Sequence, residues 1–155
     1  MTTPIPSGRL GLSVWLRLMK AYNLVLRRAR RSVGDGLTLP QFDVMAQLAR
    51  RDAGMTSVEL SRSLLVSAGN LTGIVDRLER EGLVRREAHE TDGRATRIRL
   101  TGAGRRKMAL LLPRHARDME AVFRPLPRSE VERLRDLLGS LARALEPENM
   151  TKGDR

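Results

Sequence analysis

Apolar residues recur at spacings of three and four over residues 10–33, which is the repeat of one helix face. The stripe consists of Trp15, Leu18, Tyr22, Val25, Leu26, Ala29 and Val33. The segment ends in Arg30-Arg31, and cations stabilise the C-terminal end of a helix dipole. Gly34 and Gly36 follow and are expected to stop the helix.

Three polar starting signals then divide the middle of the chain into short helices. Capping boxes at Thr38–Gln41 and Thr56–Glu59 open two of them, and the first is expected to run to about Arg51. Ser67 is the predicted N-cap of the next helix, which continues through residue 81 and is closed by Gly82. The apolar residues expected inside the helix of the second box are Val58, Leu60 and Leu64.

Residues 85–101, RREAHETDGRATRIRLT, form two strand-like runs around the polar turn Glu90–Arg94 and predict a β-hairpin. Thr101 caps a long helix from 102 to about 123, in which Pro113 is expected to kink or interrupt the hydrogen-bond ladder. A third capping box, Ser129–Glu132, is expected to open a last helix that reaches residue 145.

This order of elements predicts a fold class that is mainly α with a small β wing. It is a winged helix-turn-helix plus N- and C-terminal dimerisation helices, because the outer helices have apolar stripes and need a partner to cover them. The predicted domains are an N-terminal dimerisation helix over 1–36, a winged helix-turn-helix DNA-binding domain over 37–101, C-terminal dimerisation helices over 102–146, and a flexible tail over 147–155.

The helix over residues 68–81 has two sides at 100° per residue. The core-facing side is expected to hold Leu71, Ile74, Val75 and Leu78. The opposite side holds Gly69, Gly73, Asp76 and Arg80. A helical glycine costs about 1 kcal/mol against alanine, so two on one exposed face suggest a close approach to the floor of a DNA major groove. Tolerated surface glycines are the alternative interpretation.

Polar side chains beside the glycines supply candidate base contacts. Asn70 has the donors and acceptors to pair with adenine, and Thr72 can contact a base or a thymine methyl. Asp76 is expected to pair with Arg80 one turn on, with a cytosine amine as the alternative partner.

Arginines at the flank of this helix and on the wing supply candidate backbone contacts. Arg77 and Arg86 are placed for phosphates, although a solvated face is the alternative for each. Arg94 at the hairpin tip can enter the minor groove, held by Asp92, while Gly93 permits the turn. The predicted DNA-binding residues are Ser67, Ala68, Gly69, Asn70, Thr72, Gly73, Arg77, Arg86, Asp92 and Arg94.

Composition supports a polyanionic partner. The chain has 155 residues, a formal net charge of +11 and no cysteine, and basic side chains placed on phosphates release counterions. An arginine-rich proteome is the alternative source of this charge. The absence of cysteine excludes disulfides and thiolate metal sites. No signal peptide or membrane span is recognisable, so a cytoplasmic protein without a membrane partner is expected.

Catalysis is not expected. His89 and His115 lack nearby groups at catalytic spacing, and the sequence has no phosphate-binding glycine loop and no metal-binding histidine pair, so no cofactor or metal is predicted. Two non-enzymatic alternatives remain: a protein that coats DNA without sequence preference, and a winged helix used only to bind other proteins.

The residues resemble the MarR family (multiple-antibiotic-resistance regulators) over about 70 positions. The match runs through LTLPQFDVMAQLARR, TSVELSRSLLVSAGNLTGIVDRLEREGLVRRE and TDGRATRIRLTGAGRR. The resemblance implies a homodimer with intertwined terminal helices, which places one recognition helix per subunit in a major groove of a double-stranded, pseudo-palindromic operator. It also implies a repressor that is released by a small, often aromatic, ligand, with activation as the open alternative.

Some positions depart from the family or extend its pattern. The family wing is usually Asp-Arg-Arg, whereas this chain has Asp92-Gly93-Arg94, so one phosphate contact is expected to be lost. Pro113 is unusual in the long helix, and the lack of cysteine excludes the family's thiol-based peroxide sensing. Trp15 and Asp43 fall near the effector pockets of relatives, and Tyr22 shares the stripe of Trp15, so the three are candidate ligand-binding residues. The alternative for the tryptophan is core packing.

Overall fold

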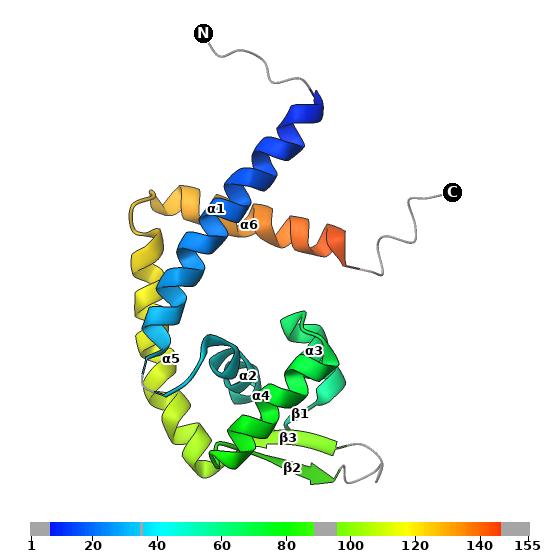
Figure 1. Ribbon diagram of the computed structural model, residues 1–155. Coiled ribbons are helices and arrows are strands. Elements are labelled where there is room, and N and C mark those ends of the chain that lie inside the picture. Colours follow the sequence, from blue (N-terminus) through cyan, green and yellow to red (C-terminus); the bar gives the residue numbers. More distant parts are fainter. Residues whose placement is uncertain (1–6, 35, 89–95, 147–155) are drawn as a thin grey trace, which may run out of the picture. The chain divides into compact units, whose positions relative to one another are not determined.

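The computed structural model describes residues 7–34, 36–88 and 96–146 (Figure 1). The chain divides into two compact units, Met1–Asp118 and Met119–Arg155. Its elements are α1 (Ser7–Val33), α2 (Leu39–Ala49), β1 (Met55–Thr56), α3 (Ser57–Leu64), α4 (Ala68–Arg80), β2 (Val84–Ala88), β3 (Thr96–Leu100), α5 (Gly102–Phe123) and α6 (Arg128–Leu145). The domain boundaries expected from the sequence stay predictions, and the tail over 147–155 lies outside the described residues.

Both capping boxes in the middle of the chain are confirmed. The amide of Gln41 donates to Thr38 Oγ1 at 3.4 Å, and the amide of Thr38 donates to Gln41 Oε1 at 2.8 Å. The same reciprocal pair joins Glu59 and Thr56 at 3.2 and 2.7 Å. These bonds satisfy amide groups that have no partner within the first turn of a helix, which is why α2 and α3 begin where they do.

Val58 and Ser129 differ from the expectations. Val58 is 63% exposed, because at 100° per residue it lies about 200° around α3 from the buried Leu60. Ser129 does not cap α6, which begins at Arg128 after Pro127 with no side-chain cap. Pro113 lies inside α5, which runs through it as one helix. The proline has no backbone N–H, so it interrupts the hydrogen-bond ladder at one position without ending the helix.

The sheet has a third strand that the sequence pattern did not reveal. The strand order is β1-β3-β2, antiparallel throughout, with Met55 opposite Ile98 and Val84 opposite Leu100. A strand of two residues is too short to show alternation, so no periodic signal marks it. Gly54 precedes β1 with φ +75°, and a Cβ there would lie 2.6 Å from the carbonyl oxygen of Ile98. Only glycine allows this approach.

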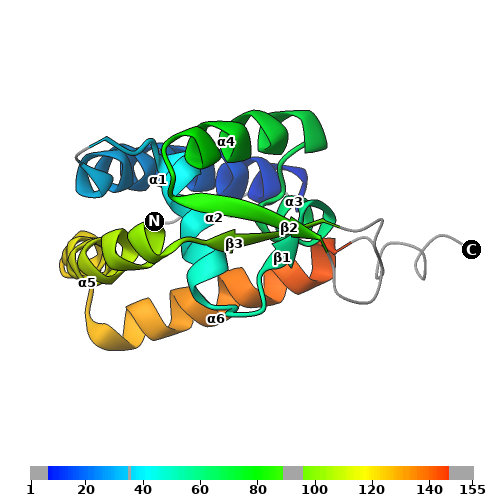
Figure 2. The same cartoon turned by 90° about the horizontal axis from the view of Figure 1, so that it is seen from below.

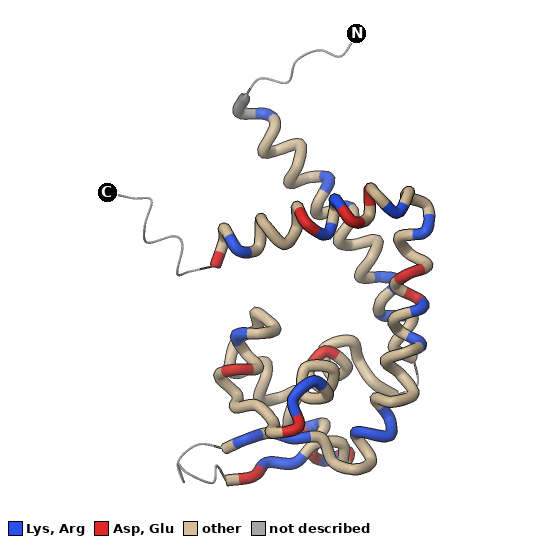
Figure 3. The backbone as a smooth tube through the Cα atoms, turned by 180° about the vertical axis from the view of Figure 1, so that it is seen from behind, with Lys and Arg blue, Asp and Glu red and all other residues tan. Residues whose placement is uncertain are grey.

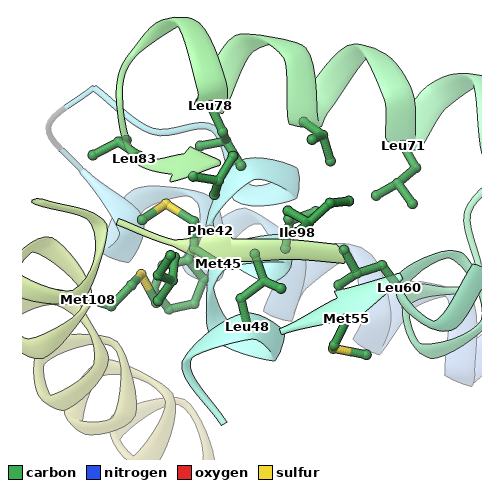
Figure 4. Packing of buried hydrophobic residues seen from close by; sticks show 14 of the residues in the cluster. Phe42, Met45, Leu48, Met55, Leu60, Leu71, Leu78, Leu83, Ile98 and Met108 are labelled. Carbon is green, nitrogen blue, oxygen red and sulfur yellow. The ribbon is translucent and has the colours of Figure 1, made fainter. Parts of the chain in front are cut away.

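A continuous apolar core joins α2, α3 and α4 to the sheet and to the first half of α5 (Figure 4). It is built largely from aliphatic side chains and methionines, as expected for a chain with 3% aromatic residues. The largest fully buried members are Met45, Met55, Leu60, Leu71, Leu78, Ile98 and Met108. Figure 2 shows the hairpin of β2 and β3 lying alongside α4. This packing sets the position of the hairpin relative to α4.

The long outer helices leave apolar side chains uncovered in the single chain. In α1 the exposed set includes Leu12, Trp15, Leu16, Tyr22 and Leu24, whereas Ala29 and Val33 at its end are buried. In α6 no residue is buried, although its large apolar side chains include Leu137, Leu138, Leu141 and Leu145. Among the described residues, no helix is sufficiently long and apolar to cross a membrane.

Candidate nucleic-acid interface

Helix α4 is anchored by its inner face. Leu71, Val75 and Leu78 are buried, and Ile74 packs against the same core. Ser67 is the N-cap, as predicted, and its hydroxyl accepts the amide of Asn70 at 3.3 Å. Since the start and the inner face are both fixed, the outer face of α4 is held rigidly toward solvent.

The outer face of α4 is smooth at its two glycines. A Cβ built on Gly69 or Gly73 would meet no described atom within 4 Å. The side chains of Ala68, Asn70, Thr72 and Arg77 are exposed around them. Thr72 already donates its hydroxyl proton to the carbonyl of Ala68 at 2.9 Å, so in this rotamer it can only accept from a base. This face therefore offers close backbone approach with polar groups on either side.

Arg86 of β2 is held by two carboxylates of α4. Its Nη2 lies 2.6 Å from Asp76 Oδ1, its Nη1 pairs with Glu79 Oε2, and its amide donates to Glu79 Oε1 at 3.2 Å. Burial by itself lowers the pKa of Arg86, but the hydrogen bonds and charges of Asp76 and Glu79 together raise it above its ordinary value. In the free protein the guanidinium of Arg86 is therefore already paired with carboxylates of α4.

The predicted ion pair between Asp76 and Arg80 is wrong. The Nε of Arg80 donates to the backbone oxygen of Asp76 at 3.4 Å, while the carboxylate turns to Arg86. Spacing along one helix identified a neighbour one turn away but could not reveal an arginine arriving from the adjacent strand. The signal available in the sequence was the second carboxylate, Glu79, one turn further along the same flank.

The arginines that alternate along β3 fasten the wing to the turn before β1. Arg97 Nη1 donates to the carbonyls of Ala53 and Gly54 at 3.3 and 3.1 Å, and Arg99 Nε donates to Ala53 at 3.1 Å. Glu87 on β2 pairs with Arg99 at 3.2 Å. Figure 3 shows basic positions on both strands of the hairpin and an acidic position on β2. These side chains therefore stiffen the base of the wing.

The tip of the wing, including Asp92, Gly93 and Arg94, lies outside the described residues. Its proposed minor-groove contact stays a prediction. The strands that would carry it, Val84–Ala88 and Thr96–Leu100, are described and paired over their full length.

The three candidate effector residues lie in unlike environments. Trp15 and Tyr22 are 56% and 54% exposed on α1, so core packing within the chain does not explain the tryptophan. Asp43 on α2 is partly buried, and burial raises the pKa of its carboxyl group against the opposing charge of His115. The structure assigns His115 a position that the sequence did not suggest: its Nδ1 lies 2.6 Å from the hydroxyl of the buried Ser32.

A groove of about 260 Å³ opens elsewhere, between the end of α2 and the first turns of α5. Leu48 and Met108 form part of its apolar wall, and Arg51 and Arg105 carry charge to it. None of the three candidate effector residues lines it. Within residues 7–34, 36–88 and 96–146, no three His, Asp or Glu side chains gather closely enough to hold a metal ion.

Asp43→Asn is expected to raise the thermal unfolding midpoint at pH 7. The folded-state pKa of this carboxyl is raised, so its ionisation destabilises the fold as pH rises above the unfolded-state pKa of about 3.9. The advantage of the asparagine should shrink as pH falls toward that value. Thermal melts of the wild type and the Asp43→Asn variant between pH 4 and pH 8 measure this difference in midpoint. Substitution of the exposed Asp52 by Asn is the control. An advantage that is constant across this range would contradict the assignment.

The sequence of this chain matches a protein family and several characterised regulators. The family model described as "MarR family" matches residues 35–95. The regulator PecS of Dickeya dadantii is 31% identical over 111 residues, which cover 70% of this chain and 67% of PecS. The transcriptional activatory protein BadR of Rhodopseudomonas palustris is 36% identical over 95 residues, and the chain spans about half of its length (54%).

Solved structures give the same result for the fold. The apo form of MarR from E. coli has 28% sequence identity and a TM-score of 0.69, with 90% of this chain and 98% of that chain covered. CouR from Rhodococcus jostii RHA1, solved bound to p-coumaroyl-CoA, has 25% identity and a TM-score of 0.76, with 83% and 91% covered. Together with the recognition helix and wing, these matches show that the chain belongs to the MarR family of winged-helix, DNA-binding transcriptional regulators.

Proposed function

We propose that this chain is a homodimeric repressor that binds a pseudo-palindromic operator and is released by a small ligand. The observation that carries the proposal is the outer face of α4, where Gly69 and Gly73 leave the helix backbone uncovered between exposed polar side chains. A major groove is wide enough to admit such a helix, and a smooth face lets it approach the base edges. Sequence reading then depends on Asn70 and Thr72, while Arg77 on the flank of the helix contacts a phosphate.

The apolar side chains left exposed on α1 and α6 support the homodimer. On α6, Leu134, Leu138, Leu141 and Leu145 recur at spacings of three and four, so they form one stripe. Each helix, taken by itself, presents more apolar surface than an isolated soluble chain normally leaves in water. Packing against a second copy of the chain would remove this apolar surface from water, which is favourable. It would also produce two α4 helices related by a twofold axis.

The release by a small ligand is supported by two observations. CouR, which shares the fold, was solved with p-coumaroyl-CoA bound. In this chain, Trp15 and Tyr22 are exposed seven positions apart on one side of α1, and the carboxyl group of Asp43 is partly buried. A ligand with an apolar, aromatic part would pack against the two aromatic side chains. A hydrogen-bonding group on the same ligand would suit the carboxyl of Asp43, whose neutral form is favoured by burial.

A second candidate is activation, since BadR is described as an activatory protein. The same DNA-binding surface serves both outcomes, because the position of the operator relative to the promoter decides between them. A transcription assay with the operator moved upstream of the promoter separates the two roles.

Selection from a pool of random duplexes tests the proposed DNA recognition. The purified protein is expected to enrich an inverted repeat whose half-sites lie about one helical turn, roughly 10 base pairs, apart. The affinity for this duplex should exceed that for random DNA by at least about a thousandfold at physiological salt. Equal affinity for both pools would instead indicate a DNA-coating protein.

Sedimentation equilibrium of the same preparation tests the dimer. The expected mass is twice the 17.4 kDa of the chain at micromolar concentration. A monomeric mass would remove the symmetry on which the inverted repeat depends.

A further inference from the structure

An acidic residue lies on the side of α4 that faces DNA in the proposed function. Asp76 follows Gly73 by three positions, so the two project within about 60° of each other around the helix. Its side chain is 50% exposed. A carboxylate in this position opposes the phosphates of a bound duplex, and juxtaposed like charges weaken binding strongly.

Arg86 compensates for this charge from the neighbouring strand. Its Nη2 contacts Asp76 Oδ1 at 2.6 Å, and the other arm of the guanidinium pairs with Glu79. The planar fork holds both carboxylates at once, which a single ammonium group cannot do in the same geometry. The backbone amide of Arg86 also donates to Glu79 Oε1, so β2 stays attached to α4 independently of the arginine side chain.

The neighbouring cations do not take this role. Arg80 directs its Nε to the backbone oxygen of Asp76, and not to the carboxylate. Arg77 is exposed on the flank of α4 and is predicted to contact phosphate itself. The three contacts of Arg86 with Asp76 and Glu79 therefore distinguish it from Arg77 and Arg80, the arginines of the outer face and flank of α4.

We propose that Arg86 acts on DNA binding through Asp76: it turns and screens this carboxylate, and is a positioning residue instead of the phosphate contact that the sequence suggests. The inference rests on the proposed function in one respect, namely that the outer face of α4 meets the duplex. Removing Arg86 exposes a bare carboxylate to the DNA, whereas removing Asp76 as well removes the repulsion.

A double-mutant cycle on the full chain tests the proposal, with affinity measured for the selected operator and for a random duplex. Arg86→Gln is expected to lower affinity about tenfold. Asp76→Asn alone should leave affinity unchanged or raise it, and the double variant should return to within about threefold of the wild type. Arg77→Gln is the matched control: it should weaken binding, and adding Asp76→Asn should not restore it.

The outcomes are distinguishable. If the double variant binds as weakly as Arg86→Gln, Arg86 contacts phosphate directly and the proposal fails. It also fails if Arg86→Gln binds normally, or if Asp76→Asn alone loses binding. Should selection enrich no operator, the proposed sequence recognition fails, yet the cycle still reports on the random duplex because screening acts on any phosphate backbone.

Folding is checked by thermal melts and by a conservative variant. Arg86→Lys keeps the charge but not the fork, so an intermediate loss of affinity is expected, again restored by Asp76→Asn. Restoration of binding without a matching change in the unfolding midpoint separates a positioning role from a structural one.

Discussion

Gly104→Ala is expected to destabilise the protein by about 3 kcal/mol and to lower its thermal unfolding midpoint by about 10 °C. A Cβ at this position of α5 would lie 2.1 Å from the carbonyl oxygen of Leu83, well inside the van der Waals contact distance. That oxygen also accepts the amide of Thr101 at 3.0 Å, so it is not free to move. The gain in helix propensity, about 1 kcal/mol, is too small to offset the clash.

Gly102→Ala is the matched control for this substitution. Its new methyl group would meet only the flexible end of Arg106, at 3.4 Å, so the stability should be unchanged or slightly higher. Chemical or thermal denaturation of the two variants provides the comparison. Equal midpoints for both would show that the first turn of α5 can move away from β2, and that the close packing is not required.

Gly73→Leu is expected to abolish specific DNA binding while the fold becomes as stable or more stable. The added side chain projects from the exposed face into space where it meets no described atom within 4 Å, and leucine favours a helix by nearly 1 kcal/mol over glycine. On the operator, the same side chain would hold the backbone of α4 away from the base edges. The loss of affinity should be at least a hundredfold.

Gly73→Ala calibrates the effect, since one methyl group should weaken specific binding less than leucine does. Footprinting on the selected operator and thermal melts together give the result. A Gly73→Leu variant that still protects the operator would refute close backbone approach, whereas a variant that has lost stability would show that the glycine has a packing role.

Much of the candidate site could be read from the sequence because it depends on contacts between near neighbours. The caps at Thr38, Thr56 and Ser67 rely on groups three residues apart. The inner and outer faces of α4 follow from the helical repeat alone. Where the same reasoning failed, as for Val58, the error lay in assigning an apolar residue to the core without checking its angle around the helix.

Other features depend on segments that are distant in the chain. Nothing local marks the pairing of Met55 with Ile98, or the arrival of Arg86 beside Asp76. The contact between Ser32 and His115 joins residues 83 positions apart. Periodicity cannot report such pairs, since it describes one element at a time.

The sequence by itself determined the type of each helix, where most of them begin and end, and which face of α4 is left for a partner, because capping and helical periodicity act over three or four residues. Only the tertiary structure decided what the charged side chains do. Arg97 and Arg99 fasten the wing to carbonyl groups, and Arg86 is held by two carboxylates, because packing the hairpin against α4 brings these groups within hydrogen-bonding distance. A long, flexible arginine side chain can contact DNA or groups of its own chain. Its neighbours in space determine which contact it makes.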